Sequence, residues 1–277
     1  MHAPTIFHIT HHKAGSQWVA EILKHAAPER VVLPKLRMAH FYDDPLRPGG
    51  VYLTVYVPKP DFDRVTVSLQ GERRVFVVMR DLRDTLISRY FSVRYSHVTN
   101  TEYLRRARRV LNELSVEDGL LTLIGQGNPL TYPADFASFL PNMTDDCMNR
   151  LNPDEFAAYL SIWTWYHAFI QLSWLNAPDV LIVRYEEFVQ DEQAVFANII
   201  MHCQLEIEQK RLRQIVADNS FTTVTGRQRG QEDIMAHQRK GIVGDWRNHF
   251  SARVKDAFKR QFGEILITTG YEQDLNW

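Results

Sequence analysis

The run from His11 to Trp18, which reads His-His-Lys-Ala-Gly-Ser-Gln-Trp, has the residue types of an anion-binding loop. A β-rich run precedes it, and apolar residues recur at helical spacing after it. The first N–H groups of a helix lack internal partners, and the helix dipole favours negative charge at that end. Gly15 allows the backbone to approach closely, and Lys13 adds a full positive charge. The pattern therefore predicts an anion site.

A simpler interpretation of the same run is an ordinary strand–turn–helix connection with an exposed lysine, and the run by itself does not decide between the two. The Walker pattern Gly-x-x-x-x-Gly-Lys-Ser/Thr is absent. Nucleoside triphosphate chemistry, such as that of a P-loop kinase, is therefore disfavoured. Nothing in the run predicts a magnesium site.

Three segments resemble, in order, the motifs of sulfotransferases that use 3′-phosphoadenosine-5′-phosphosulfate (PAPS). The run from His11 is similar to their 5′-phosphosulfate loop, Lys-Ser/Thr-Gly-Thr-Thr-Trp. Val77–Phe91 resembles their 3′-phosphate motif, Arg-(Asp/Asn)-x-(Arg/Lys)-Asp-x-x-x-Ser-x-Tyr. Arg239–Asn248 is similar to their C-terminal signature, Arg-Lys-Gly-x-x-Gly-Asp-Trp-Lys-Asn. The chain is identified as a member of the cytosolic-type family, which implies a parallel sheet flanked by helices.

The resemblance implies where PAPS would bind. The loop would hold the 5′-phosphosulfate, two residues eight positions apart would hold the 3′-phosphate, and the C-terminal signature would complete that pocket. Two aromatic residues would stack on the adenine. The implied residues are Lys13, Ala14, Gly15, Ser16, Gln17, Trp18, Arg80, Ser88, Phe221, Arg239, Lys240 and Gly241. A phosphate dianion suits this set because arginine supplies a fixed fork and lysine a point charge.

Some of these residues also have ordinary structural interpretations. Arg80 could cap a neighbouring helix, and Asp81, Arg83 and Asp84 could form surface ion pairs. Trp246 is expected to be a core residue rather than a ligand contact.

The resemblance implies an enzyme that moves a sulfuryl group from PAPS to a hydroxyl or amine of a small-molecule acceptor and releases 3′,5′-ADP. Such in-line transfer depends on positioning and electrostatics, by analogy with phosphoryl transfer. Lys13 is expected to be catalytic, because it would stabilise the leaving phosphate oxygen. No metal is expected.

The general base is the weakest part of the match. The family has a histidine in a Lys-Thr-His-Leu-Pro-like segment, whose counterpart here, Thr54–Pro58, lacks both the lysine and the histidine. Tyr56 is a poor base at neutral pH, since a tyrosine titrates near pH 10. His40 is the leading replacement, because a histidine titrates in the useful range. The further candidates are His11, His12, Glu21 and His97.

The elements that position these residues follow from periodicity. Strands are predicted at Thr5–Thr10, Val51–Val57, Arg74–Met79 and Val180–Tyr185. Helices are predicted from Trp18 and at Leu82–Tyr95, Thr101–Gly127, Pro153–Trp174, Gln190–Cys203, Glu208–Asn219 and Ala252–Thr269. Asn128–Asn152 and Thr222–Gly241 are predicted to be irregular. Strands that alternate with helices, some of them continuous apolar runs, predict one α/β domain over residues 1–277 with a mainly parallel sheet.

Composition narrows the class of protein. The 32 basic and 33 acidic side chains nearly cancel, so a globally basic nucleic-acid binder is not expected. No run of about 18 apolar residues occurs, so no membrane partner is expected. The N-terminus does not resemble a signal peptide. Cys147 and Cys203 form no metal or disulfide pattern. The expected compartment is the cytoplasm.

Two questions stay open at the level of sequence. A binding module that keeps the PAPS pocket without turnover is the alternative to an enzyme, because the Lys-Thr-His segment is missing. The acceptor is not encoded in a motif; its pocket is expected from Phe41–Gly50, Arg94–Thr101 and Gly127–Asn152. The Lys-Thr-Val-Glu dimer motif of animal relatives is absent after Phe250, so the oligomeric state is not predicted.

Overall fold

The computed structural model of the chain describes residues 3–33, 46–125 and 145–277. The chain groups into two compact units. The first consists of Met1–Arg80 and Ser173–Gln231, and the second of Asp81–Leu172 and Glu232–Trp277. The boundaries predicted from the sequence, one domain over residues 1–277, stay a prediction.

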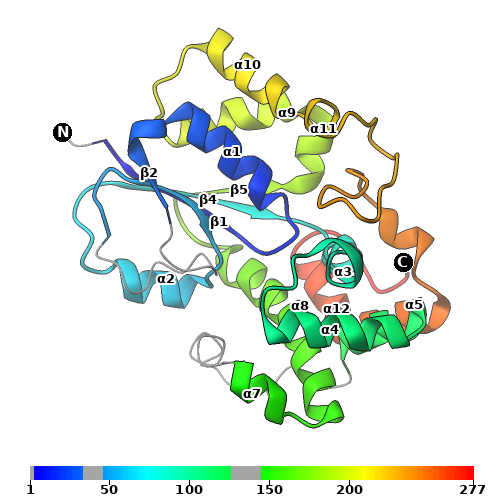
Figure 1. Cartoon of the computed structure of the whole chain (residues 1–277). Coiled ribbons are helices and arrows are strands. Elements are labelled where there is room, and N and C mark those ends of the chain that lie inside the picture. The colour runs from blue at the N-terminus through cyan, green and yellow to red at the C-terminus, as the bar shows by residue number, and fades with distance from the viewer. Residues whose placement is uncertain (1–2, 34–45, 126–144) are drawn as a thin grey trace. The chain divides into compact units, whose positions relative to one another are not determined.

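The first unit is built on a parallel five-stranded sheet in the order β2-β3-β1-β4-β5 (Figure 1). The strands are β1 (Thr5–Thr10), β2 (Val31–Val32), β3 (Val51–Val55), β4 (Arg73–Met79) and β5 (Val180–Arg184). All six residues of β1 are buried, as expected for the middle strand of a sheet with both faces covered. The predicted α/β class with a parallel sheet flanked by helices is confirmed.

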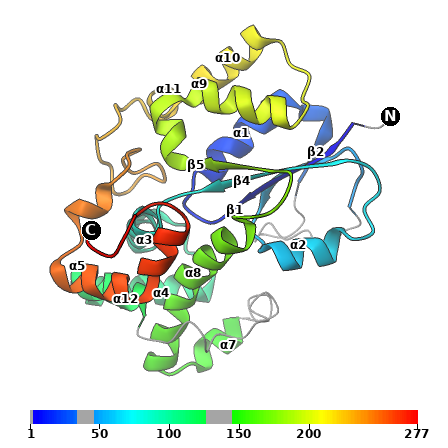
Figure 2. The same cartoon turned by 180° about the vertical axis from the view of Figure 1, so that it is seen from behind.

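Helices cover both faces of this sheet (Figures 1 and 2). On one face lie α1 (Ser16–Ala26), α9 (Tyr185–His202) and α10 (Gln209–Asp218), and on the other lies α2 (Lys59–Thr66). The core beneath α1 joins apolar side chains of these helices to the sheet, with Ile22, Phe76 and Phe196 among those fully or almost fully buried. Two short helices, η1 (Pro28–Arg30) and α11 (Phe221–Thr225), complete the first unit.

The second unit is helical. Its elements are α3 (Leu82–Phe91), the π-helical turn η2 (Ser92–Ser96), α4 (Glu102–Glu113), α5 (Val116–Ile124), α7 (Asp145–Arg150), α8 (Pro153–Trp174, whose last two residues belong to the first unit), the 3-10 helix η4 (Asp245–Asn248) and α12 (Ala252–Thr268). Arg89 ties α3 to α8 and α4, because it donates hydrogen bonds to the Leu160 carbonyl oxygen at 2.7 Å and to the Tyr103 hydroxyl at 3.0 Å.

Several predicted boundaries were wrong. The segment predicted as one helix over Thr101–Gly127 is two helices, α4 and α5. The Ser115 hydroxyl accepts a hydrogen bond from the Asp118 N–H at 3.1 Å and so begins α5 as its N-cap. Helix α2 begins after Pro58, where only the end of a strand was predicted. Helix α9 begins at Tyr185, and Asp191 interrupts it with non-helical torsion angles.

Candidate functional site

The loop between β1 and α1 has the geometry of an anion site. Lys13 and Gly15 take left-handed φ angles of 70° and 82°, and the helical Ser16 follows. A left-handed residue next to a right-handed one turns consecutive N–H groups into a concave nest. Gly15 is the N-cap of α1 and provides no side-chain cap, and the first turn has no acidic residue. The predicted strand–loop–helix is therefore present, with its helix N-terminus suited to an anion.

Residues that follow the other strands brace this loop. Arg80, directly after β4, donates a hydrogen bond to the Lys13 carbonyl oxygen at 2.9 Å. Its guanidinium lies 4.2 Å from the ring centre of Tyr185, directly after β5. A side chain at Gly15 would begin 3.1 Å from the Tyr185 ring. Tyr185 was not among the predicted site residues, although the carboxyl ends of parallel strands share one sheet edge and ligands bind there.

Tyr56, which follows β3, also reaches the loop. Its hydroxyl and the Ser16 hydroxyl form a hydrogen bond of 3.0 Å. The imidazole of His12 stacks on the Tyr56 ring, with ring centres 4.0 Å apart and planes 27° apart. Burial raises the pKa of Tyr56, and the hydrogen bond from Ser16 only partly offsets this. Tyr56 is thus a fixed wall of the loop and holds His12 beside Lys13.

The two predicted adenine-stacking residues share one neighbour. The guanidinium of Arg229 lies 5.6 Å from the ring centre of Trp18 and 5.7 Å from that of Phe221, and it is paired with Glu192 at 3.0 Å. Trp18 is half-buried, packs against Phe188 and has a buried indole N–H without a hydrogen-bond partner among the described residues. Stacking of either ring on adenine stays a prediction.

In the second unit, the C-terminal signature forms a compact ionic cluster. Arg239 and Lys240 both bind the carboxylate of Asp245, in the second case with an N–O distance of 2.7 Å. Arg239 also pairs with Glu232, and its guanidinium lies 4.4 Å from the ring centre of Phe91. Gly241 takes a left-handed φ of 65°. Two of the three cations predicted to bind the 3′-phosphate, Arg239 and Lys240, are therefore brought together on one carboxylate.

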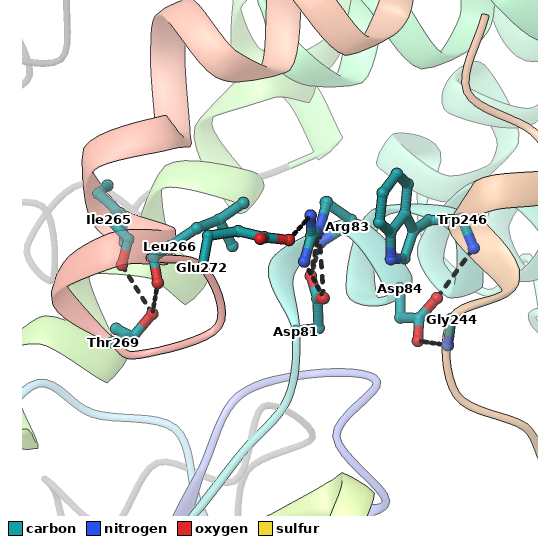
Figure 3. Close-up of polar contacts among 9 residues, drawn as sticks. All are labelled: Asp81, Arg83, Asp84, Gly244, Trp246, Ile265, Leu266, Thr269 and Glu272. Carbon is teal, nitrogen blue, oxygen red and sulfur yellow. Dashed lines mark hydrogen bonds and ion pairs between the residues drawn. The ribbon is translucent and has the colours of Figure 1, made fainter. Parts of the chain in front are cut away.

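The segment Asp81–Asp84 contacts the residues on either side of Asp245, as Figure 3 shows for Asp84. Both carboxylate oxygens of Asp84 accept backbone hydrogen bonds at the start of η4, from the Gly244 N–H at 2.6 Å and the Trp246 N–H at 3.0 Å. Arg83 pairs with Asp81 at 2.7 Å. A carboxylate at the N-terminus of a helical turn supplies the acceptor that its N–H groups lack.

The interpretation of Asp81, Arg83 and Asp84 as surface ion pairs was wrong, because all three side chains are buried. The Arg83 guanidinium lies 4.1 Å from the ring centre of Trp246 and 4.4 Å from that of Trp277, and these two rings pack edge to face. It also pairs with Glu272, just beyond α12. Glu272, a partner of Arg83, and Gly244 and Trp246, the partners of Asp84, lie some 160 to 190 positions further along the chain, so no local pattern predicted this burial.

The remaining predicted residues are placed as follows. Ser88 is half-buried on α3, two turns after Asp81. Ala14 and Ser16 are buried, and Gln17 is exposed. His40 and parts of the predicted acceptor loops lie outside the described residues. Thr222–Gly241 has little regular structure beyond α11, as predicted.

Comparison with known proteins identifies the family. Residues 63–270, well over half of the chain, match the family model described as the sulfotransferase domain. The chain belongs to this family. A curated 3-alpha-hydroxysteroid sulfotransferase from Cavia porcellus is 24% identical over 113 residues, which span 38% of this chain and 39% of that protein.

Two solved structures share the fold. Mouse sulfotransferase SULT7A1 complexed with PAP superposes with a TM-score of 0.58 at 16% identity, over 95% of this chain and 84% of that one. Retinol dehydratase in complex with androsterone and inactive cofactor PAP superposes with a TM-score of 0.50 at 13% identity, over 96% of this chain and 81% of that one. At such low identity the likeness is one of fold.

The structure distinguishes the environments of the candidate bases. Burial lowers the pKa of His11 to about 4, and the imidazole is fully enclosed, so it is a poor proton acceptor. Glu21 pairs with Lys24 on α1 at 2.6 Å. His97 lies at the end of η2 in the second unit. Only His12 among the described candidates is both half-buried and adjacent to Lys13.

The described residues contain neither a metal-binding group nor a membrane-spanning helix. No group of three or more His, Cys, Asp or Glu side chains with metal-binding geometry occurs in residues 3–33, 46–125 and 145–277. Within the same ranges, no helix is both long and apolar enough to cross a membrane.

Proposed function

We propose that the protein is an enzyme that moves a sulfuryl group from PAPS to a hydroxyl or amine of a small-molecule acceptor and releases 3′,5′-ADP. The loop from His11 to Trp18 carries this proposal, because it presents a helix N-terminus, a left-handed nest and Lys13 to one anion. Membership in the sulfotransferase family and the PAP in the two fold neighbours support PAPS as the co-substrate.

The proposed residues divide the donor between two anionic groups. Lys13 and the backbone of Ala14–Trp18 would bind the 5′-phosphosulfate. Arg80, Ser88 and the Arg239–Gly241 segment would bind the 3′-phosphate, for which a fork and a point charge are suitable. Trp18 and Phe221 would stack on the adenine.

The proposed transfer depends on positioning and electrostatics rather than on covalent catalysis by the chain. An acceptor oxygen or nitrogen attacks sulfur, the bond from sulfur to the phosphate oxygen breaks, and the acceptor loses a proton. Lys13 would neutralise the charge on the departing oxygen, and His40 or His12 would take the proton. No step requires a metal.

Names of similar proteins suggest an order for the acceptor search. The curated relative is a hydroxysteroid sulfotransferase, and one fold neighbour was solved with androsterone. Steroid-like alcohols are therefore the first acceptors to test, ahead of phenols and amines.

Binding and transfer test the proposal in sequence. Calorimetry should show that 3′,5′-ADP binds more tightly than 5′-AMP and ATP, and labelled PAPS should then transfer its label to an acceptor. Lys13→Ala should lower turnover by about 10²–10³-fold, because loss of one such donor costs about 2.7–4 kcal/mol in the barrier. Lys24→Ala, which changes a half-exposed lysine paired with Glu21 on the same helix, is the matched control.

The outcomes separate the alternatives. A preference for ATP would refute a PAPS site, and substantial turnover by Lys13→Ala would remove Lys13 from the chemistry. PAPS binding without transfer to any acceptor would favour the catalytically silent module. That alternative has one observation in its favour: at the position of the family's histidine stands Tyr56, whose hydroxyl is engaged by Ser16.

A further inference from the structure

Arg239 and Lys240 share a single buried acceptor, Asp245. The Asp245 side chain is only 3% exposed, yet it is surrounded by donors. It binds Arg239, Lys240 at 2.7 Å and the Asn248 amide at 2.9 Å, and Nε2 of His249 lies 3.3 Å away. Burial alone would raise the pKa of Asp245, but these hydrogen bonds outweigh it and hold the pKa well below its ordinary value. The group is therefore a permanent anion at neutral pH.

The position of Asp245 is itself fixed from behind. The residues on either side of it, Gly244 and Trp246, donate their backbone N–H groups to the buried carboxylate of Asp84 on α3. Trp246 is buried against the guanidinium of Arg83. Asp245 thus projects from a backbone that cannot shift without breaking buried hydrogen bonds, which is costly.

Two like charges this close would otherwise repel each other. Arg239 and Lys240 are adjacent in sequence, and each has several rotatable bonds whose ordering costs free energy. An anion that binds both in advance offsets the repulsion and removes part of that cost before a ligand arrives. Arg239 also lies on the Phe91 ring, which limits the directions that its guanidinium can take.

Arg239 has a second acidic partner of a different kind. Glu232 pairs with the same guanidinium, but its side chain is 34% exposed. Glu232 and Asp245 therefore each bring one negative charge to Arg239, but the Glu232 side chain is partly solvated and the Asp245 side chain is buried. The pair provides an internal comparison between charge and positioning.

We infer that Asp245 is a positioning residue that sets Arg239 and Lys240 for recognition of a nucleotide 3′-phosphate, and so determines the preference for 3′-phosphorylated nucleotides. Asp245 acts through the two cations and does not contact the ligand. This inference rests on the proposed function, because it takes Arg239 and Lys240 as the 3′-phosphate site.

Calorimetry with 3′,5′-ADP and 5′-AMP on the full chain tests it, since the two ligands differ only in the 3′-phosphate. Asp245→Asn keeps the shape of the side chain and removes its charge. We expect 3′,5′-ADP to bind about 10- to 100-fold more weakly, the range that the loss of a hydrogen bond to a charged group implies. Binding of 5′-AMP should stay within about twofold, which a general loss of structure would not allow.

Glu232→Gln is the matched variant. Both substitutions remove one negative charge from Arg239, so an effect of charge alone would make both variants bind 3′,5′-ADP more tightly. Positioning predicts weaker binding for Asp245→Asn and equal or tighter binding for Glu232→Gln. Tighter binding by both variants, or an unchanged ratio between 3′,5′-ADP and 5′-AMP in Asp245→Asn, would overturn the inference.

A milder variant covers the case in which Asp245→Asn does not fold. Asn248→Ala removes one donor from Asp245 and leaves every charge in place. We expect a loss of several-fold in 3′,5′-ADP affinity with 5′-AMP unchanged, and no loss would refute the positioning role. A wild-type chain that binds 3′,5′-ADP and 5′-AMP equally would instead contradict the proposed function, which is a distinct result.

Discussion

At the scale of single residues, the surroundings of Lys13 narrow the choice of a general base for the proposed transfer. The proposed transfer needs a base that takes the proton of the acceptor near neutral pH. Enclosure removes His11 from that role by lowering its pKa to about 4, and it removes Tyr56 by raising its pKa. His12 keeps a half-buried imidazole against the Tyr56 ring, while His40 is the candidate that the sequence favours.

Substituting His12 and His40 one at a time distinguishes these two candidate bases. We expect the variant that loses the base to lose about 10²–10⁴-fold in kcat/KM and to lose the acidic limb of its pH–rate profile. Binding of 3′,5′-ADP should not change. His25→Ala, on the last turn of α1, is the control. Tyr56→Phe keeps the ring on which His12 stacks and should keep the profile; unchanged profiles for both His12→Ala and His40→Ala would exclude both residues.

At the scale of elements, the turn between β4 and α3 has two tasks. Arg80 ends the strand and braces the Lys13 loop, whereas Asp81, Arg83 and Asp84 fix the segments around η4 and beyond α12. Arg83 contacts the indole rings of Trp246 and Trp277. It also pairs with the carboxylates of Asp81 and Glu272. A planar guanidinium suits this position, because it can stack and form hydrogen bonds at the same time.

Arg83→Met should therefore destabilise the second unit. Removing one partner leaves buried carboxylates uncompensated, and losses of this kind cost about 3–5 kcal/mol. Urea denaturation measures the change. Arg253→Met, which removes an exposed arginine from its pairs with Glu117 and Asp118, should change stability little. Equal changes in the free energy of unfolding for the two substitutions would show that the burial of Arg83 adds nothing to its contribution to stability.

At the scale of the whole molecule, acid should weaken folding through neutral histidines inside the sheet unit. Burial lowers the pKa of both His8 and His11 from 6.5 to about 4. The unfolded chain therefore binds protons between these values that the folded chain does not bind. Their contribution to stability is complete above pH 6.5 and is lost progressively as the pH falls towards 4.

Between pH 7.5 and 5.5 the free energy of unfolding should fall by about 1.4 kcal/mol for each of the two histidines. Denaturation curves at both pH values measure this fall. His8→Asn keeps a side-chain donor near the Leu53 carbonyl oxygen, the hydrogen-bond partner of His8. The variant should be less stable at pH 7.5 but should show a smaller fall, by about 1.4 kcal/mol. The same fall as in the wild type would mean that His8 does not titrate differently on folding.

Short-range patterns were enough for much of the fold. Runs of β-rich or apolar residues predicted four of the five strands, and the fifth, β2, has only two residues and too little pattern to detect. The helix predicted over Pro153–Trp174 has the same bounds in the structure. The segment Thr101–Gly127 was wrongly predicted to be one helix, because a serine N-cap within a helical composition is a weak local signal.

The sequence by itself determined the strand–loop–helix around Lys13 and the adjacent cations at Arg239 and Lys240, because both depend on neighbours within a few residues. Only the tertiary structure decided what surrounds them. Tyr56 and Tyr185 reach the loop because parallel strands end at one edge. Asp84 binds backbone groups 160 positions away or more, and Asp245 is itself buried. Both features depend on contacts that span the chain. Composition therefore shows which charged side chains are present, whereas tertiary packing decides which of them are held in one position.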